Sequence, residues 1–348
     1  FSARRTFPGA GTNGPGSGSR AGPEGNRMDG ADLDRIHAPV MPERVVELVA
    51  PALDREGAIY VDATLGMGGH ALAVLTACPR ARLIGFDRDA EAIGIAARRL
   101  AGVADRVTTV HAVYDELDER LDELGVDEVD AVLFDLGVSS LQLDEAERGF
   151  SYMQDAPLDM RMDRSGGTTA AELVATLDER ELRGLFQRYG DEPLAGRYAR
   201  AIVEARATAP IVTTGELVDL LQRATPAARR NAGHPAKRVF QALRIEVNGE
   251  LRALESALPQ ALRRVREGGR VVVEAYQSLE DRFVKRAFAE ASTSTAPAGL
   301  PFVPPEYEPE FRLLTRGAEQ APETETADNP RAKPVRLRAV ERIRSPRT

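Results

Sequence analysis

Two spacings of the hydrophobic residues, one typical of strands and one typical of helices, alternate along the first part of the chain. Short apolar, β-branched runs predict strands at 58–64, 81–89, 106–114 and 129–140. Segments with helical spacing lie between them, such as "HALAVLTAC" and "AEAIGIAARRLAG". The fourth run is nearly all apolar, which is typical of a strand buried on both faces. This order of strands and helices predicts βαβ units and a mostly parallel α/β sheet.

The alternation stops at residue 143. Residues 143–246 contain no convincing strand, and their apolar positions have helical spacing. Thr169 and Thr213 stand where two of these helices are expected to start, as N-caps. We therefore expect an inserted helical domain at 143–246, between a first part (37–142) and a second part (247–348) of an α/β domain.

The α/β pattern then resumes. A helix at 248–265, a strand at 268–276 and a helix at 278–291 are expected. The runs "EFRLLT" (310–315) and "VRLRAVERI" (335–343) predict a closing β-hairpin, and the stretch between them is expected to be a mobile loop. A basic tail ends the chain.

Residues 1–36 form a leader of a different composition. The stretch "PGAGTNGPGSGSRAGPEGN" is rich in glycine and proline and has almost nothing to bury, so the leader is expected to be disordered. It has no apolar core of a secretory signal. An organellar transit peptide is a weak alternative, and Met28 is a candidate start.

Composition restricts the class of protein further. A single cysteine, Cys78, excludes a disulfide framework within the chain and fits a reducing, cytoplasmic setting. The four histidines lack metal-ligand spacing, so no metal site is expected. No apolar run approaches the roughly 20 residues of a membrane span. The net charge of −8 argues against a nucleic-acid partner, but a local basic patch is enough to hold phosphates.

A glycine turn follows the first expected strand in "YVDATLGMGGHALAVL". It lacks the lysine of a nucleotide-binding P-loop, which argues against ATP or GTP as a phosphoryl donor. Gly66, Gly68 and Ala71 fit the pattern G-x-G-x-x-[GA], and Asp87 ends the next strand, in place to accept ribose hydroxyls. The spacing leaves NAD and S-adenosylmethionine (SAM) as close competitors, with a plain tight turn as the structural alternative.

Asp135 stands at the carboxyl end of the fourth expected strand. Open α/β sheets place ligand chemistry at this edge. Many amine-directed methyltransferases carry an Asp or Asn followed by prolines there, but this chain lacks the prolines. A helix cap or a turn is the alternative role of Asp135.

Several blocks together resemble one family closely, the MraW (RsmH) family of bacterial ribosomal RNA small-subunit methyltransferases. The blocks include "VDATLGMGGHA", "FDLGVSSLQLDEAERGFSYMQDAPLDMRMD", "HPAKRVFQALRIEVNGEL" and "SLEDRFVKRAF", and they span about 37–343. The resemblance implies a class I SAM-dependent methyltransferase fold, Rossmann-like with a mostly parallel sheet. It also implies methylation of the exocyclic amine N(4) of a cytidine in 16S rRNA, at position 1402, with SAM as cofactor.

The resemblance also assigns residues. The cofactor-binding positions that it implies are Gly68, Gly69, His70, Asp87, Tyr114, Asp135 and Gln142. Asp135 is also our candidate catalytic residue. We expect direct in-line methyl transfer without a covalent enzyme intermediate. Two positions depart from the family, since Tyr276 and Gln277 stand where Phe and His are more common. We expect this place to contact RNA or to support the fold.

Basic residues gather in two places, around 223–244 and 331–347, and the resemblance favours RNA binding over an ordinary solvated surface. The candidate RNA contacts are Arg161, Arg230, Lys237, Arg238, Arg331 and Arg336. The expected partner is 16S rRNA within the small ribosomal subunit, with a homodimer left open. The block at 149–163 mixes aromatic, acidic and basic residues and is a candidate wall for a splayed-out base.

Two other interpretations of the function remain open at this point. An NAD-dependent oxidoreductase fits the glycine turn but leaves Asp135 and the basic clusters without a role. A non-catalytic RNA-binding protein that retains an inactive SAM fold is the other, and Gln277 is the residue that favours it.

Overall fold

The computed structural model describes residues 38–139, 142, 145–229, 233–297, 304 and 307–345. The expected leader lies outside these residues, as do Arg230 and the end of the basic tail. No described helix has the length and apolar composition needed to cross a bilayer.

Within the described residues, seven strands form one sheet in the order β3-β2-β1-β4-β5-β7-β6. The strands are β1 (Ile59–Asp62), β2 (Arg82–Asp87), β3 (Val107–His111), β4 (Val129–Asp135), β5 (Val265–Ala275), β6 (Phe311–Leu313) and β7 (Arg336–Arg342). Strands β1 to β5 pair in parallel, whereas β7 is antiparallel to β5 and to β6. The expected mostly parallel sheet and the terminal pairing are confirmed, although β4 ends earlier than 140.

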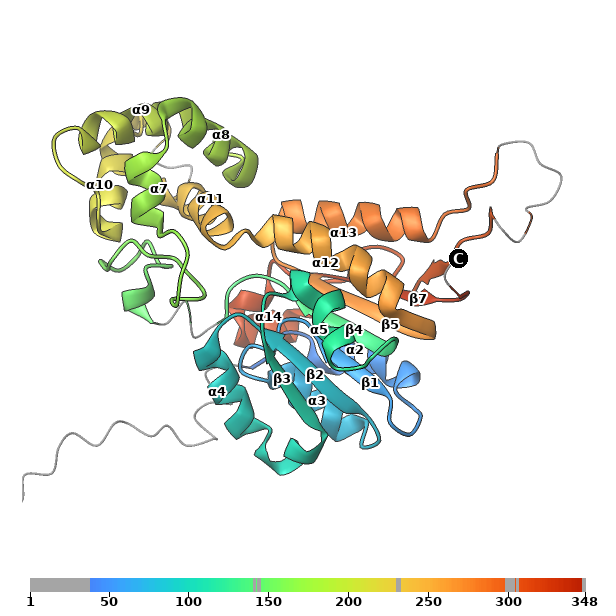
Figure 1. The fold of residues 1–348 in the computed structure, drawn as a ribbon. Coiled ribbons are helices and arrows are strands. Elements are labelled where there is room, and N and C mark those ends of the chain that lie inside the picture. Colours follow the sequence, from blue (N-terminus) through green and yellow to red (C-terminus); the bar gives the residue numbers. More distant parts are fainter. Residues whose placement is uncertain are drawn as a thin grey trace, which may run out of the picture.

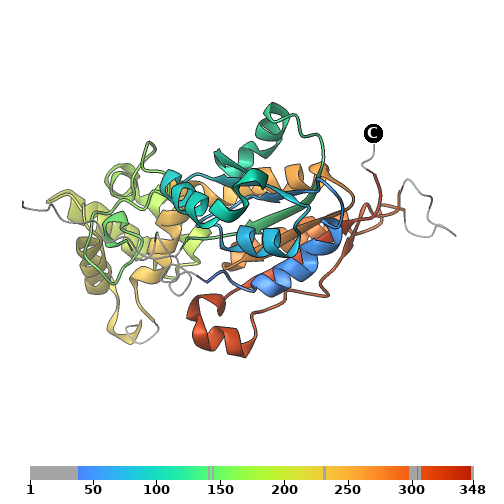
Figure 2. The same cartoon turned by 90° about the horizontal axis from the view of Figure 1, so that it is seen from below.

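Helices cover both faces of the sheet (Figures 1 and 2). The chain places α2 (Pro42–Val49), α3 (Gly69–Ala77) and α4 (Ala90–Arg99) early, then α5 (Leu117–Glu123), and later α12 (Glu250–Arg264) and α13 (Ser278–Ala291). Side chains of α2 and α3 pack on one face in one core, and those of α5, α12 and α13 pack on the other in a second core. The buried strand β4 contributes Leu133 to the first core and Phe134 to the second, as expected for a strand between two helical layers.

A helical region follows the loop after β4 and lies beside the sheet (Figure 1). Its helices are α7 (Ala170–Thr176), α8 (Glu179–Gly190), α9 (Ala195–Arg206), α10 (Thr214–Ala224) and α11 (Ala236–Asn248). They enclose a third, separate core. We refer to residues 145–248 as the helical region and to the other described residues as the sheet region. The exact domain limits, 143 and 246, stay a prediction.

Local signals explain where these helices start. Thr169 and Thr213 are N-caps with complete capping boxes, as expected. The stretch 169–190 is two helices and not one, because Asp178 forms a further capping box that starts α8.

The expectation of a mobile loop between β6 and β7 is wrong. That stretch contains α14 (Glu323–Asp328) and the 3₁₀ turn η7 (Pro330–Ala332). Glu325 Oε1 accepts a hydrogen bond from the N–H of Met41 at 2.7 Å, and Ala332 is fully buried in the core beside α2. These long-range contacts dock a polar segment that looks loop-like in sequence.

The order of strands, with the antiparallel β7 inserted between β5 and β6, confirms the expected class I methyltransferase architecture. In such a sheet, ligands bind outside the carboxyl ends of the parallel strands. That edge faces the helical region.

Candidate functional site

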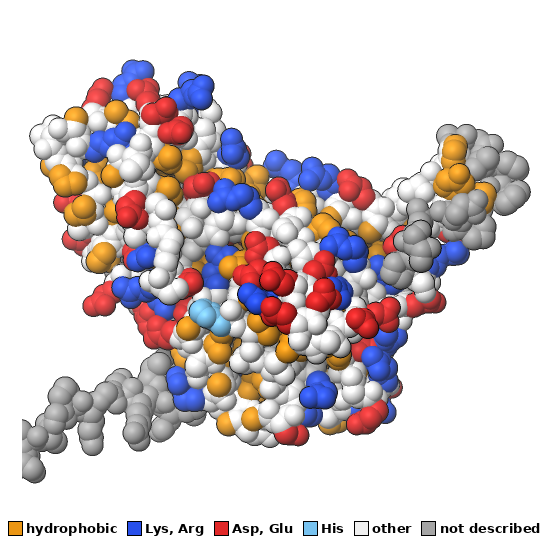
Figure 3. All heavy atoms as spheres, in the orientation of Figure 1, with side chains coloured by type: hydrophobic (Ala, Val, Ile, Leu, Met, Phe, Trp, Pro, Cys, Tyr) orange, Lys and Arg blue, Asp and Glu red, His pale blue; other side chains and the backbone are white. Residues whose placement is uncertain are grey.

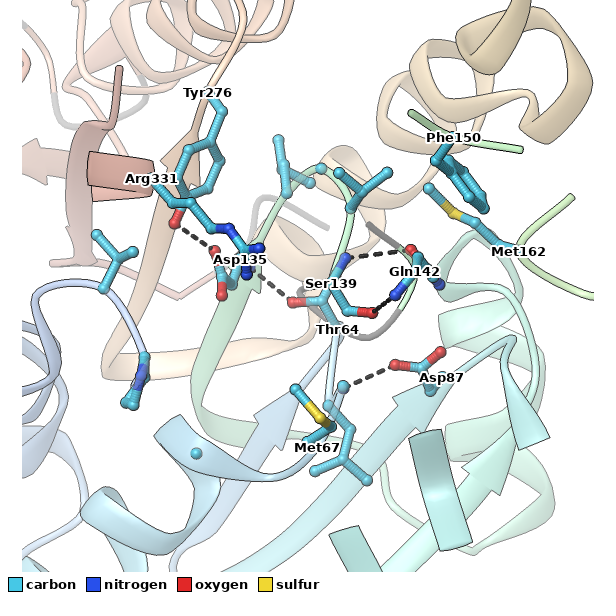
Figure 4. Close-up of a pocket in the computed structure, with 18 of the residues that line it drawn as sticks. Thr64, Met67, Asp87, Asp135, Ser139, Gln142, Phe150, Met162, Tyr276 and Arg331 are labelled. Carbon is cyan, nitrogen blue, oxygen red and sulfur yellow. Dashed lines mark hydrogen bonds between the residues drawn. The ribbon is translucent and has the colours of Figure 1, made fainter. Parts of the chain in front are cut away.

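A cavity of about 530 Å³ lies at the carboxyl ends of β1 to β5. It is lined by residues that follow these five strands, by α11 and by the loop at 150–162 of the helical region. Figure 4 shows how side chains from these separate elements converge on it. The cavity therefore combines the part of the sheet where chemistry was expected with a wall from the helical region.

The glycine turn forms the floor beside β1. Gly66 and Gly68 have positive φ of 51° and 78°, which favours glycine at both positions. A Cβ on Gly68 would lie 3.3 Å from Cβ of Ala96, so this glycine allows the turn to pack on α4. Gly69 and His70 line the cavity, but Gly68 does not. Gly68 thus shapes the turn, and its expected contact with a cofactor stays a prediction.

Asp87 ends β2 and lines the cavity. Its Oδ2 accepts a hydrogen bond from the N–H of Gly66 at 2.7 Å, and its Oδ1 accepts one from the N–H of Asp89 at 2.8 Å. Burial raises the pKa of Asp87 to about 6, although these two hydrogen bonds act in the opposite direction. A carboxylate that is desolvated at the edge of a cavity can accept hydrogen bonds from the hydroxyl groups of a ligand.

Tyr114 and Gln142 occupy the side of the cavity near β3 and β4. The Tyr114 ring meets Phe134 edge to face at 5.6 Å, and its hydroxyl donates to the carbonyl of Glu250 at 3.3 Å. Gln142 is buried, and its Nε2 donates to Asp89 Oδ2 at 3.3 Å. Tyr114 therefore offers a fixed aromatic surface, whereas Gln142 ties the loop after β4 to the cap of α4.

Asp135 lies at the centre of the cavity wall. Its N–H donates to Thr64 Oγ1 at 2.7 Å, and its Oδ1 accepts from the hydroxyl of Tyr276 at 2.9 Å (Figure 4). Its side chain is 28% exposed, so carboxylate lone pairs remain open to the cavity. Among the described residues its carboxylate accepts no backbone N–H, which argues against a helix-cap role.

His70 and Glu274 lie next to Asp135. The Nε2 of His70 is 3.5 Å from Asp135 Oδ2 and 3.2 Å from Glu274 Oε2. Burial alone would lower the pKa of His70, but the charge of Glu274 and the contact with Asp135 outweigh it and raise this pKa well above its usual range. Sequence reasoning missed Glu274, and the available signal was one acid within the apolar run "VVVEA".

Of the two departures, Tyr276 has a role that depends on its side chain. Tyr276 supplies the hydroxyl that holds Asp135. The N–H groups of Tyr276 and Gln277 both donate to Glu280 Oε2 at 3.0 Å, at the start of α13. Both side chains also line the cavity. Tyr276 therefore supports the fold around Asp135, whereas the hydrogen bond of Gln277 comes from its backbone. A contact of this place with RNA stays a prediction.

The helical region supplies an aromatic wall. Tyr152 stacks on His234 with ring centroids 4.6 Å apart and meets Phe240 edge to face at 5.9 Å. Tyr152, Phe240 and Phe150 line the cavity. Two of these three come from the block expected to form a wall for the base, and the structure places that block opposite Asp135.

The candidate RNA-binding residues separate into groups. Lys237 and Arg331 line the cavity, and Arg238 is exposed near it with one guanidinium N–H on the carbonyl of Asp191. Arg161 forms a two-pronged ion pair with Asp159, at 2.7 and 2.8 Å, and Arg336 donates to backbone carbonyls. Arg230 lies outside the described residues. The geometry thus favours Lys237, Arg238 and Arg331 among the six.

Other arginines of the two basic clusters serve the fold. Arg244 pairs with Glu250, Arg338 with Asp281, and Arg342 with Glu310, where it also covers the ring of Phe311. Acidic side chains gather in the area of α5 on the face that Figure 3 shows (Figures 1 and 3). The positive charge that is open to a ligand is therefore more local than the sequence suggests.

Comparisons with known proteins agree on one family. The MraW methylase family model matches residues 34–343. A ribosomal RNA small subunit methyltransferase H from Clavibacter michiganensis is 62% identical over 90% of this chain and 98% of its own length. The protein of that name from Thermobifida fusca is 60% identical over 89% of this chain and 94% of its own length.

A solved rRNA methylase from Streptococcus thermophilus covers 87% of this chain and 94% of its own, at 11% identity with a TM-score of 0.40. Likeness at that level decides nothing about the function. The family model covers nearly all the described residues, including every residue that lines the cavity, and the relative from Clavibacter michiganensis covers 90% of the chain. By these matches, the chain belongs to the MraW methylase family.

Proposed function

We propose that this chain is a SAM-dependent methyltransferase that modifies N(4) of a cytidine, at position 1402, in 16S rRNA of the small ribosomal subunit. The observation that carries the proposal is one cavity that joins the glycine turn and Asp87 to Asp135 and to an aromatic wall. The relatives' printed name supports the class of RNA.

The residues present suit SAM. When bound, SAM would supply an electrophilic methyl group. Asp87 would accept the two ribose hydroxyls, and the Tyr114 ring would pack against the adenine. Gly69 and His70, in the first turn of α3, lie where a helix N-terminus attracts negative charge, which suits the methionine carboxylate.

The target cytosine needs help from the protein because the lone pair of its amine is delocalised into the ring. Asp135 would accept one amine hydrogen and turn the lone pair toward the methyl group. Its charge would also stabilise the positive charge that develops on nitrogen in a site with little water. Much of the rate would come from holding two reactants in line.

The aromatic wall would hold the base after it leaves its stack. Base–aromatic stacking contributes on the order of 1–3 kcal/mol per base. Tyr152 and Phe240, with His234 stacked on Tyr152, form an aromatic surface that lines the same cavity as Asp135. Lys237 and Arg331 would neutralise nearby phosphates.

Methyl transfer from labelled SAM to small ribosomal subunits that lack the modification tests the proposal. We expect label in one cytidine of 16S rRNA and none in subunits that already carry the methyl group. Calorimetric titration of the protein with SAM and, separately, with NAD tests the oxidoreductase alternative. SAM binding without any methyl transfer would instead support the inactive RNA-binding protein.

A further inference from the structure

Three ionisable groups meet beneath the cavity, and we name them the charge cluster: His70, Asp135 and Glu274. Their nitrogen and oxygen atoms lie within 4.8 Å of one another. Glu274 is fully buried and His70 is 6% exposed. Beyond these mutual contacts, neither oxygen of Glu274 nor either ring nitrogen of His70 has a hydrogen-bond partner among the described residues.

Charge balance restricts what this cluster holds. Two carboxylates beside a neutral imidazole would leave buried negative charge without compensation, at a cost of several kcal/mol. Of the other groups around the cluster, Asp62 on β1 and Glu325 on α14 are acids, and Tyr60 and Tyr276 carry no positive charge. Arg331 lines the same cavity and is drawn beside Asp135 in Figure 4, but Glu274 is fully buried and does not line the cavity. The buried negative charge is therefore balanced by a proton, on His70 or on Glu274, or by a bound metal ion.

The contacts of Nε2 favour a proton on His70. This nitrogen faces a carboxylate oxygen on each side, at 3.2 and 3.5 Å. Two carboxylates at these distances stabilise a charged imidazole ring over a neutral one. Nδ1 has no partner among the described residues, which is equally unfavourable for a metal-bound ring and for a doubly protonated ring.

We propose that Glu274 is a positioning residue that keeps His70 protonated, and that this imidazolium holds the Asp135 carboxylate in its orientation toward the cytosine amine. The inference rests on the proposed function for the role of Asp135. Both oxygens of Asp135 are then fixed, Oδ1 by the Tyr276 hydroxyl and Oδ2 by the His70 imidazolium. Glu274 never reaches substrate, because it is fully buried behind His70.

Nuclear magnetic resonance of the histidine rings tests the charge without any RNA. In protein labelled with ¹⁵N at histidine, the His70 ring should show the protonated form at pH 8, where an ordinary histidine is neutral. Glu274→Gln should lower the pH of His70 titration by at least one unit. Glu341→Gln, which removes a carboxylate on β7 outside the cavity, should leave it unchanged.

Two results would contradict a protonated His70. A neutral His70 ring at pH 8 in the unaltered protein overturns it, even where Glu274→Gln does not fold. Stoichiometric zinc, manganese or magnesium in the purified protein, removed by chelator with a change at the His70 ring, also overturns it, since the cation is then a metal ion.

Single-turnover methylation measures the consequence for catalysis. In Glu274→Gln, the rate with both substrates saturating should fall at least tenfold at pH 8 and less at pH 6, where His70 regains its proton. The Michaelis constant for SAM should change by less than threefold. A uniform loss at all pH values would mean a merely structural role. Absence of methylation by the unaltered protein would overturn the proposed function alone, because the ring titration is independent of it.

Discussion

The acidic residues at the cavity edge of the sheet differ from those of the helical region in the direction of their pKa shifts. In the helical region, Asp159 pairs with Arg161 and Glu172 closes a capping box, and the pKa of each is lowered. At the cavity edge of the sheet, burial raises the pKa of Asp62 to about 7 and that of Asp87 to about 6. Burial also raises the pKa of Glu274.

This contrast separates two uses of charge. Acids whose pKa falls on folding stabilise the region in which they lie, because the folded state favours their charged form. Acids whose pKa rises are held at a cost, and such groups cluster where a ligand is bound or a reaction takes place. This contrast agrees with the proposal that the sheet region holds the chemistry and that the helical region supplies the wall for the base.

The largest expected effect is that of Asp135→Asn, which keeps the size and one acceptor oxygen but removes the charge. With both substrates saturating, we expect the single-turnover rate to fall by roughly 10²-fold or more, about 2.7 kcal/mol. Tyr276→Phe, which removes only the hydroxyl that holds Asp135, is the matched control and should lose less. A near-normal rate for Asp135→Asn leaves Asp135 as a cofactor ligand only.

The next effect concerns Asp87. Each charge-assisted hydrogen bond to a ribose hydroxyl is worth on the order of 1.5–3 kcal/mol, so Asp87→Ala should weaken SAM binding at least tenfold in calorimetry. Asp105→Ala, at an exposed position of the 3₁₀ helix Ala101–Arg106, is the control. Equal SAM affinity in the two variants would remove Asp87 from the site.

The pKa of Asp87 adds a pH dependence with a definite sign. Because its folded-state pKa is about 6 without ligand, the carboxylate becomes protonated as the pH falls through 6. SAM affinity should therefore decrease below pH 6, by roughly tenfold per pH unit, and level off above pH 7. Asp87→Ala should make the affinity nearly independent of pH in this range.

A smaller effect is expected from the basic residues of the helical region. Lys237→Glu combined with Arg238→Glu should raise the Michaelis constant for ribosomal subunits roughly threefold to tenfold. The dependence on salt should become shallower, because lost phosphate contacts release fewer counterions. SAM affinity should stay the same. Lys285→Glu, an exposed residue of α13 outside the cavity, serves as control, and an equal effect there would indicate a general charge effect.

The smallest effect on activity is expected from the removal of a helix N-cap. Thr169→Ala removes one capping box of the helical region and should cost about 1 kcal/mol in the free energy of unfolding, measured in urea. SAM affinity should be unchanged, because the cofactor side of the cavity belongs to the sheet region. A parallel loss of SAM affinity would show that the two regions are coupled, against the contrast drawn above.

The sequence by itself determined most of the local structure. Hydrophobic period, glycines and threonine caps located the strands, the glycine turn and the starts of α7 and α10, because these signals act within a few residues. The positions of Asp87 and Asp135 followed from the rule that ligands bind at the carboxyl ends of parallel strands. The resemblance to one family then supplied a cofactor and a substrate.

Only the tertiary structure decided which charges meet. Glu274 lies 204 positions after His70 in the chain (274 − 70), and no spacing rule connects them, yet two parallel strands and a helix start bring them within 3.2 Å. In the same way, the docking of α14 on α2 placed Arg331 at the cavity, and ion pairs engaged Arg161, Arg244 and Arg338. Long-range pairing depends on how the elements pack together, and the local pattern of residues does not contain that information.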